Sequence, residues 1–226
     1  MSRHSMLTYL SDLSEHNERE WFHENKARYT EASQEFEILV SQLMQELCRM
    51  DENISPAAPK ELTFKLMRDT RFSHDKSPYH PAFRAHIGPK GKLPIPVGYY
   101  IMVKPGGQSF LGGGLFADQF KDATTMVRDA ITANSEDWER IITAPAFVEC
   151  FTVKGTALKK VPQGYDPCHP QAAYLKNKSW YLEYPVTDER VRDVDFVGFA
   201  VRIFAKMKEF NGFLNRALAD FQRPRR

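Results

Sequence analysis

Residues 98–116 have the sequence GYYIMVKPGGQSFLGGGLF, the clearest strand–turn–strand pattern in the chain. Two runs rich in aromatic and β-branched or other apolar residues, 98–103 and 109–116, flank the turn residues Pro105-Gly106-Gly107. Such runs favour strands, and proline and glycine favour the tight connection between them. The segment therefore predicts an antiparallel hairpin.

Three consecutive glycines, Gly112-Gly113-Gly114, lie inside the second run. Glycine within a strand indicates a bulge or a backbone that another group approaches closely. A helix is predicted from residue 117, and the backbone donors at a helix N-terminus favour anions. The glycines match neither the phosphate-loop nor the dinucleotide-binding pattern. We favour the bulged strand, and the anion site remains the alternative.

Alternation of apolar and polar residues predicts further strands at 62–66, 83–87 and 180–184, the last of these stopped by Pro185. Apolar residues at three- and four-residue spacing predict a short helix at 6–13 and a long one at 18–50. Further helical patterns cover 117–133, the segment after Ser135, and 193–218. Trp21, Tyr29, Phe36 and Leu43 are the predicted core of the long helix, and Asn25 is predicted to anchor a neighbouring loop.

These elements predict an α+β fold with a meander-like antiparallel sheet of about four to six strands, packed by N- and C-terminal helices. We expect one domain over residues 1–226. It would be helical over 1–55, mainly strands over 60–116, mixed over 117–186, and helical again over 187–222.

The composition, with 42% hydrophobic and 27% charged residues, is typical of a globular protein. No apolar run approaches the ~20 residues that span a bilayer, and no signal peptide is visible. The three cysteines, Cys48, Cys150 and Cys168, form no C-x-x-C motif. We therefore expect a soluble cytoplasmic protein with reduced thiols, no cofactor and no membrane association.

The net charge of +2 hides an uneven distribution. Residues 12–52 contain eleven acidic and four basic residues, residues 60–92 eight basic and three acidic, and residues 154–178 five basic and one acidic. The two basic segments indicate a local anion site, or only solvated faces that differ in charge.

The densest chemistry is in residues 68–80, RDTRFSHDKSPYH. Arginine and lysine side chains bind carboxylate or phosphate groups, and histidine titrates near neutral pH. We predict an anion site in a loop that closes over the sheet, with these ligand-binding candidates: Arg68, Arg71, Lys76, Tyr79, His80 and Lys178. Weak catalytic candidates are His80, Tyr79 and Asp75. The alternative is internal pairing of Arg68 or Arg71 with Asp69 or Asp75.

His74, His80 and His86 lie six residues apart. Even spacing puts them on one face only if the strand is unbroken, and Pro81 argues against that. A three-histidine zinc site is the alternative interpretation, and our prediction is no metal site.

The chain resembles the conserved hypothetical proteins grouped as domain of unknown function 2461, over about residues 7–218. The resemblance rests on four sets of residues: Asn17, Trp21-Phe22, Asn25-Lys26 and Tyr29; 68–73 and 75–79; Gly98-Tyr99-Tyr100 and 112–115; and Leu158, Pro162, 164–166, His169-Pro170 and Lys178. It implies an intracellular α+β protein of bacteria or fungi and implies no activity.

Three functions remain open from the sequence, which does not decide whether the protein is an enzyme. The first is a pocket for a small anion or phosphate ester around residues 68–80, with or without catalysis. The second is a non-enzymatic module for an anionic macromolecule such as RNA, whose bases would stack on Phe72, Tyr79, Tyr99 and Tyr100. The third is a structural or adaptor protein whose charged loop only stabilises the fold.

Overall fold

The computed structural model describes residues 4–116 and 120–223. Its helices, in chain order, are α1 (His4–Glu15), α2 (Arg19–Glu24), α3 (Lys26–Met50), α4 (Pro59–Leu62), α5 (Lys121–Ala133), α6 (Ser135–Thr143), α7 (Pro145–Val148), α8 (Ala172–Leu175), α9 (Asp188–Arg192), α10 (Phe196–Ala205) and α11 (Lys208–Ala217). Its strands are β1 (Phe83–Ile87), β2 (Tyr99–Val103), β3 (Ser109–Leu115) and β4 (Trp180–Val186).

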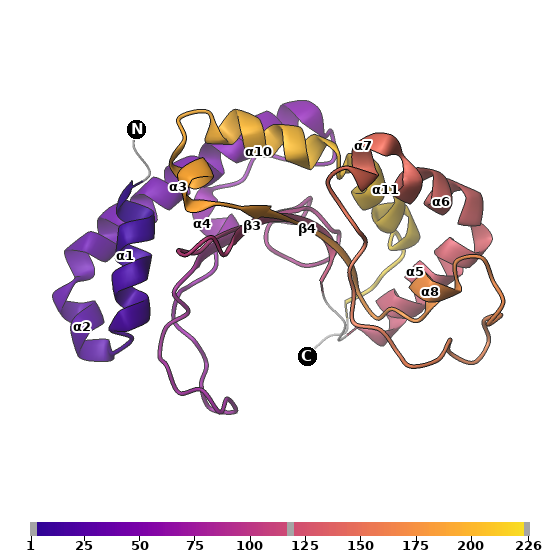
Figure 1. Cartoon of the computed structure of the whole chain (residues 1–226), viewed down its shortest axis with the longest axis horizontal. Coiled ribbons are helices and arrows are strands. Elements are labelled where there is room, and N and C mark those ends of the chain that lie inside the picture. The colour runs from indigo at the N-terminus through magenta and orange to yellow at the C-terminus, as the bar shows by residue number, and fades with distance from the viewer. Residues whose placement is uncertain (1–3, 117–119, 224–226) are drawn as a thin grey trace.

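The four strands form one antiparallel sheet in the order β1-β2-β3-β4. The predicted hairpin joins β2 to β3, and the helices α5 to α8 lie between β3 and β4 in the chain. In Figure 1 the sheet is seen edge-on as an arch. The predicted α+β fold with a meander-like sheet is confirmed.

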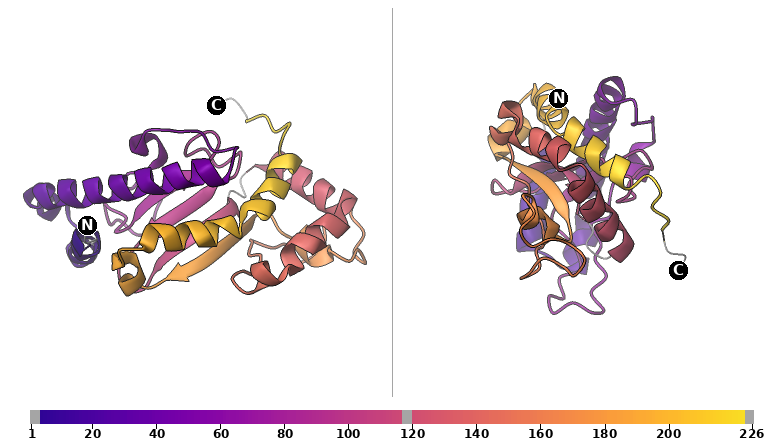
Figure 2. Two further views of the ribbon diagram at one scale, coloured as in Figure 1. Left: turned by 90° about the horizontal axis from the view of Figure 1, so that it is seen from above. Right: turned by 90° about the vertical axis from the view of Figure 1, so that its right-hand side faces the viewer.

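Helices α3 and α10 lie side by side on the outer face of the arch (Figures 1 and 2). The apolar stripe of α3 is buried there and includes Phe36, Leu39, Leu43 and Leu47. The ring of Phe36 stacks on that of Phe83 in β1, with centroids 5.3 Å apart. Burial of each such side chain contributes about 1.5–3 kcal/mol. Hydrophobic burial therefore fixes α3 on this face.

Helices α1 and α2 lie at one end of the arch, and α5, α6, α7, α8 and α11 form the other end (Figure 1). Trp138 of α6 is fully buried there, with ring centroids 5.6 Å from Phe210 and 5.1 Å from Phe213 of α11. One hydrophobic cluster runs through both ends of the molecule, from Met6 to Leu218. The two ends of the arch therefore share a core.

The predicted helix over 18–50 is two helices, because the backbone of Asn25 leaves the helical conformation at φ −98° and ψ 20°. Phe36 and Leu43 are buried as predicted, whereas Trp21 and Tyr29 are only partly buried against the core. The prediction for Asn25 is wrong, since its side chain donates to Trp21 O within α2, 3.0 Å away.

Two strand predictions also need correction. Residues 62–66 form no strand, because Leu62 ends α4 and Thr63 makes only an isolated bridge to Ala85. Strand β4 continues through Pro185 to Val186. It lies at the edge of the sheet, where a proline costs no hydrogen bond to a further strand.

Candidate functional site

The sheet has one face covered by helices and one that we call the open face. Successive side chains of a strand point to opposite faces. In β2, Tyr99 and Ile101 are buried toward the helices, whereas Tyr100 and Met102 are half-buried on the other side. In Figure 1 the open face is the inner side of the arch, between the loop 68–80 and the segment around α8.

Five aromatic side chains form a row on the open face. Tyr100 is at its centre, with ring centroids 6.3 Å from Phe64, 5.6 Å from Phe110 and 5.5 Å from Phe116. Phe116 stacks in turn on Tyr181 of β4 at 4.6 Å. This aromatic row crosses the open face from β1 to β4. Phe116 is 37% exposed, so the row presents a ring surface to solvent.

A hollow of about 260 Å³ lies against the aromatic row and is lined by four of its five rings. Gly112 provides the room, since a Cβ there would lie 3.0 Å from Phe116 Cζ and 3.2 Å from Phe110 Cε2. On the covered face, a Cβ on Gly113 would lie 2.9 Å from Met207 Sδ. The glycines therefore let side chains approach β3 closely from both sides.

Arg84 of β1 lies on the open face beside the aromatic row. Its guanidinium lies over the Phe64 ring, 5.6 Å from the centroid, and its Nη2 donates to Lys65 O at 3.2 Å. Burial raises the pKa of the Tyr100 hydroxyl, and Arg84 opposes this rise. Lys92 lines the hollow together with Glu183, whereas Arg84 lies outside its lining. Aromatic and cationic groups are therefore interleaved on this face.

The two basic segments of the sequence lie at opposite ends of the open face. Residues 60–92 enter it beside β1, and residues 154–178 bound it beside β4 (Figure 1). Lys154 is paired there with Glu183, 2.8 Å away. The acidic segment 12–52 forms α1 to α3, on the outer side and at one end of the arch. The basic segments of the sequence therefore border the open face, and the acidic segment lies away from it.

The loop 68–80 is paired internally. Arg68 is paired with Asp75, and the Arg71 side chain makes three hydrogen bonds to Asp69, the shortest of them Nη2–Oδ2 at 2.6 Å and Nε–Oδ1 at 2.9 Å. Lys76 Nζ donates to the carbonyl of residue 70 at 3.0 Å. Hydrogen bonds from residue 77 and then Arg68 hold the pKa of Asp75 well below its usual range. The pairing interpretation is confirmed for both arginines.

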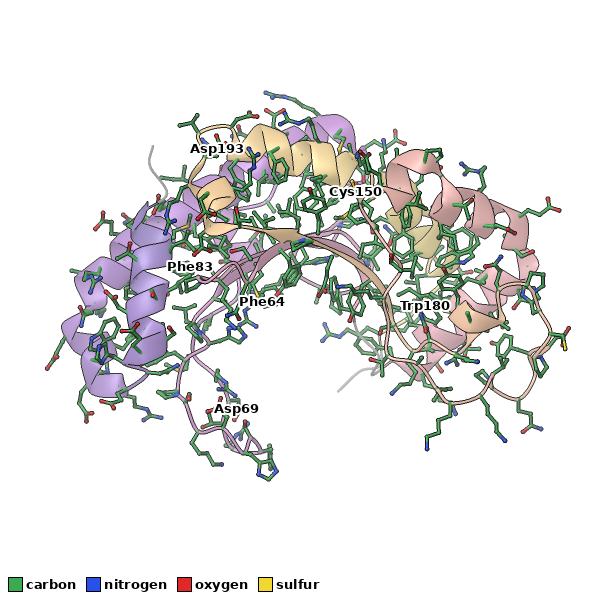
Figure 3. All side chains as sticks on the ribbon, in the orientation of Figure 1. Phe64, Asp69, Phe83, Cys150, Trp180 and Asp193 are labelled. Carbon is green, nitrogen blue, oxygen red and sulfur yellow. The ribbon has the colours of Figure 1, made fainter. Side chains whose placement is uncertain are left out.

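The loop extends away from the sheet and does not close over it (Figure 3, where Asp69 marks the loop). The ion pairs of the loop join residues within the loop itself, so they do not hold it against the open face. Lys178 lies near Trp180, at the other end of the arch, where its backbone N–H donates to Thr156 O at 2.7 Å. The structure therefore does not bring Lys178 together with residues 68–80.

Three of the predicted ligand-binding residues do come together at the base of the loop. A second hollow, of about 370 Å³, is lined by Arg68, Lys76 and Tyr79 together with Asn17 and Arg19. Two glutamates, at positions 18 and 20, line it as well. This hollow has basic residues that can bind a small anion, and it also has two carboxylates that oppose such binding.

The three catalytic candidates do not interact with one another as catalytic groups would. Asp75 is exposed and bonded to Ser77 at 2.9 Å and 2.7 Å, and Tyr79 is buried under Phe22, whose ring stacks on it at 4.2 Å. His80 is half-buried beside β1. No arrangement of nucleophile and base connects these three side chains within the described part of the chain.

The three-histidine hypothesis is wrong for the described residues, among which no group of three metal-ligating side chains occurs. His74 is exposed on the loop, whereas His86 is buried with Nδ1 3.2 Å from Gly91 O. Burial lowers the pKa of His86 to about 4. His86 therefore serves as a neutral group beneath the first hollow.

A family model described as conserved hypothetical protein (DUF2461) matches residues 5–213. The chain belongs to this family. No curated protein and no solved structure matches the chain. None of the helices in the described residues is long and apolar enough to cross a membrane. The family resemblance carried by the sequence is thereby confirmed, and any activity has to be argued from the geometry of this member.

Sequence reasoning about this DUF2461 protein missed most of the open face. Of the four aromatics predicted to stack, Tyr99 is buried and donates to Asp51 Oδ2 at 2.7 Å, and Tyr79 is buried too. Tyr100 lies in the aromatic row, and Phe72 is 94% exposed at the tip of the loop. Strand alternation could have found Arg84, because it lies between two buried positions of β1.

Proposed function

We propose that this protein binds single-stranded nucleic acid across the open face of its sheet. The observation that carries the proposal is the aromatic row between the two basic segments, 60–92 and 154–178. Single-stranded nucleic acid needs both features, ring surfaces for the bases and cations for the phosphates. In this role the protein is a binding module and not an enzyme.

The rings of the row support base stacking. Phe116 stacks on Tyr181 of β4, and together with Phe64 and Tyr100 it lines the first hollow. Its volume of about 260 Å³ suits one or a few planar rings and not a duplex. Stacking of one base on an aromatic side chain contributes about 1–3 kcal/mol.

The distribution of charge favours binding of a polyanion on the open face over binding on the acidic helices. A polyanion approaching the acidic helices α1 to α3 is repelled, whereas the open face offers Arg84 and Lys92 between two basic ends. Phosphate contacts make affinity depend on salt because bound counterions are released. A net charge of +2 is compatible with this, since binding depends on the local field.

Free cysteines support the compartment that we propose, the cytoplasm. Cys48, Cys150 and Cys168 are all unpaired thiols. Free thiols persist in reducing compartments such as the cytoplasm, and nucleic acids are present there.

A second candidate function is small-anion binding in the hollow at the base of the loop. Its support is that Arg68, Lys76 and Tyr79 line the same hollow. The two candidates use different residues, so they can be separated by substitution.

The test is fluorescence anisotropy of labelled single-stranded RNA and DNA oligonucleotides with the full-length protein at several salt concentrations. Tyr100→Ala and Arg84→Gln should each weaken binding by about tenfold or more. The matched control is Arg190→Gln, because Arg190 lies over the Phe199 ring at 4.8 Å, a cation–π pair like Arg84 and Phe64 but outside the open face. Equal losses for both arginine variants, or no binding by the wild type, would refute the proposal.

A further inference from the structure

Three basic side chains gather where the open face meets the loop. Arg84 is on β1 opposite Met102 of β2, and Lys104, two residues further on, points to the same face. His80 is held beside them by its backbone, whose N–H donates to Leu66 O at 2.7 Å. The backbone of Lys104 is fixed in turn by both bonds to the Ser109 hydroxyl, each 3.0 Å long.

Two nitrogens of this cluster are buried without a partner. Neither His80 Nδ1 nor Arg84 Nε has a hydrogen bond to any described residue, although neither atom faces solvent. An unsatisfied buried polar group costs about 1–3 kcal/mol. A ligand oxygen that accepts a hydrogen bond from either nitrogen would remove this cost.

The charges around His80 are all of one sign. Burial, followed by the charges of Arg84, Lys104 and Arg68, lowers the pKa of His80 below its ordinary value. Arg68 is compensated by Asp75, but no carboxylate of the described residues is among the groups that act on His80. The protonated form of the His80 ring is therefore disfavoured, because the ring is half-buried and surrounded by cations.

We propose that His80, Arg84 and Lys104 form a subsite for one phosphate group at the loop end of the open face. The inference deepens the proposed function and rests on it for the source of the phosphate. A phosphate oxygen can accept from Arg84 Nε, and a second oxygen from the protonated His80 ring. Lys104 supplies a further positive charge, and the ring of Phe64 holds the guanidinium plane in place.

The affinity of this subsite for an anion should depend on pH. An anion beside His80 favours the imidazolium, so the pKa of His80 rises on binding and affinity increases as the pH falls. Inorganic sulfate is the suitable probe, because its charge stays constant over the pH range in which histidine titrates. The four groups that determine the response are His80 itself, Arg84, Lys104 and Arg68.

The experiment is an NMR titration of the histidine rings of the full-length protein, with sulfate exchanged for chloride at constant ionic strength. Sulfate should raise the pKa of His80 by about one unit, while the ring signals of the exposed His74 should not respond to sulfate. Arg84→Gln and Lys104→Met should each reduce the shift, and Arg190→Gln should not. An unchanged His80, or an equal shift of His74, would overturn the subsite.

The same titration with a single-stranded oligonucleotide separates this inference from the proposed function. If the oligonucleotide binds but leaves the pKa of His80 unchanged, the subsite is wrong and the open-face proposal stands. If sulfate shifts His80 but the oligonucleotide does not bind, the subsite belongs to a free phosphate ligand and the proposed function is wrong. If sulfate and the oligonucleotide each raise the pKa of His80, and Tyr100→Ala loses only the effect of the oligonucleotide, the subsite and the proposed function are both supported.

Discussion

The side-chain amide of Asn17 binds both backbone polar groups of Tyr79. Its Nδ2 donates to Tyr79 O at 2.9 Å, and its Oδ1 accepts from Tyr79 N–H at 3.0 Å. The Phe22 ring stacks on the ring of Tyr79, with centroids 4.2 Å apart. The turn between α1 and α2 thus fixes the end of the loop 68–80, and with it the position of His80.

Asn17→Ala should destabilise the protein by about 1–3 kcal/mol, because it leaves a part-buried backbone donor and acceptor without partners. Asn17→Asp should also destabilise it, since a carboxylate cannot donate to Tyr79 O. Urea denaturation measures both effects. The control is Asn134→Ala, which removes only a local bond from an exposed amide to Ala130 O. A loss no greater than that of the control would show that the clamp is unimportant.

His86 should make stability depend on pH. It is 6% exposed, and its folded pKa of about 4 lies below the unfolded value of about 6.5. The unfolded state therefore binds more protons between these values. The stability present above pH 6.5 is lost as the pH falls toward 4, by about 3 kcal/mol at most.

Denaturant melts at a series of pH values measure this loss. His86→Gln should flatten the dependence between pH 6.5 and 4, whereas substitution of the exposed His74 should leave it unchanged. Equal pH profiles for wild type and His86→Gln would contradict the assignment. His80, whose pKa is also lowered, acts in the same direction and is separated by its own variant.

Gly114 should tolerate no side chain. Its φ is +93°, and a Cβ there would lie 2.4 Å from Trp180 O, a backbone atom that cannot move freely. Gly107 is the matched control, with φ +68° and nothing within 4 Å of a Cβ. Gly107→Ala should cost about 1–2 kcal/mol from backbone strain alone, and Gly114→Ala about 1–3 kcal/mol more from the clash.

Thermal or urea unfolding of the two variants measures the difference. Similar losses for both would mean that β3 shifts to accept the methyl group and that the close approach of β4 is not required. A much larger loss for Gly114→Ala would explain the third glycine of the triplet by packing, without an anion site at this turn.

The hairpin around Pro105-Gly106-Gly107 could be predicted because turn residues and strand residues are local signals. Which faces these strands present is also local, and Arg84 could have been recognised from alternation. The partner of Asn17 could not, since nothing near Asn17 indicates a backbone 62 residues away. Periodicity instead favoured Asn25, whose amide stays within its own helix.

The two basic segments were visible in the sequence, but their meeting on one face was not. It depends on the crossover α5 to α8 returning the chain to β4 beside β3. Charge pairing within the loop 68–80 was one of two open interpretations. Local geometry decided between them, because Asp69 and Arg71 are close enough in the chain to pair without help from the fold.

Arg68 and Arg71 should differ in their effect on small-anion binding. Arg68 lines the hollow at the base of the loop, whereas Arg71 is 77% exposed and bonded to Asp69. Exposed ion pairs contribute little to stability. Arg71→Gln should therefore leave the melting temperature and any anion effect unchanged, while Arg68→Gln should abolish stabilisation by phosphate, pyrophosphate or nucleotides if the hollow binds them.

The measurement is a thermal melt of the wild type and both variants with and without each anion, in parallel with Arg84→Gln. Loss of the anion effect in Arg68→Gln alone would favour the second candidate function over the open face. Loss in Arg84→Gln alone would favour the phosphate subsite, since Arg84 does not line the hollow at the base of the loop. An anion effect that survives in all three variants would contradict both sites, because neither cluster would then bind the ion.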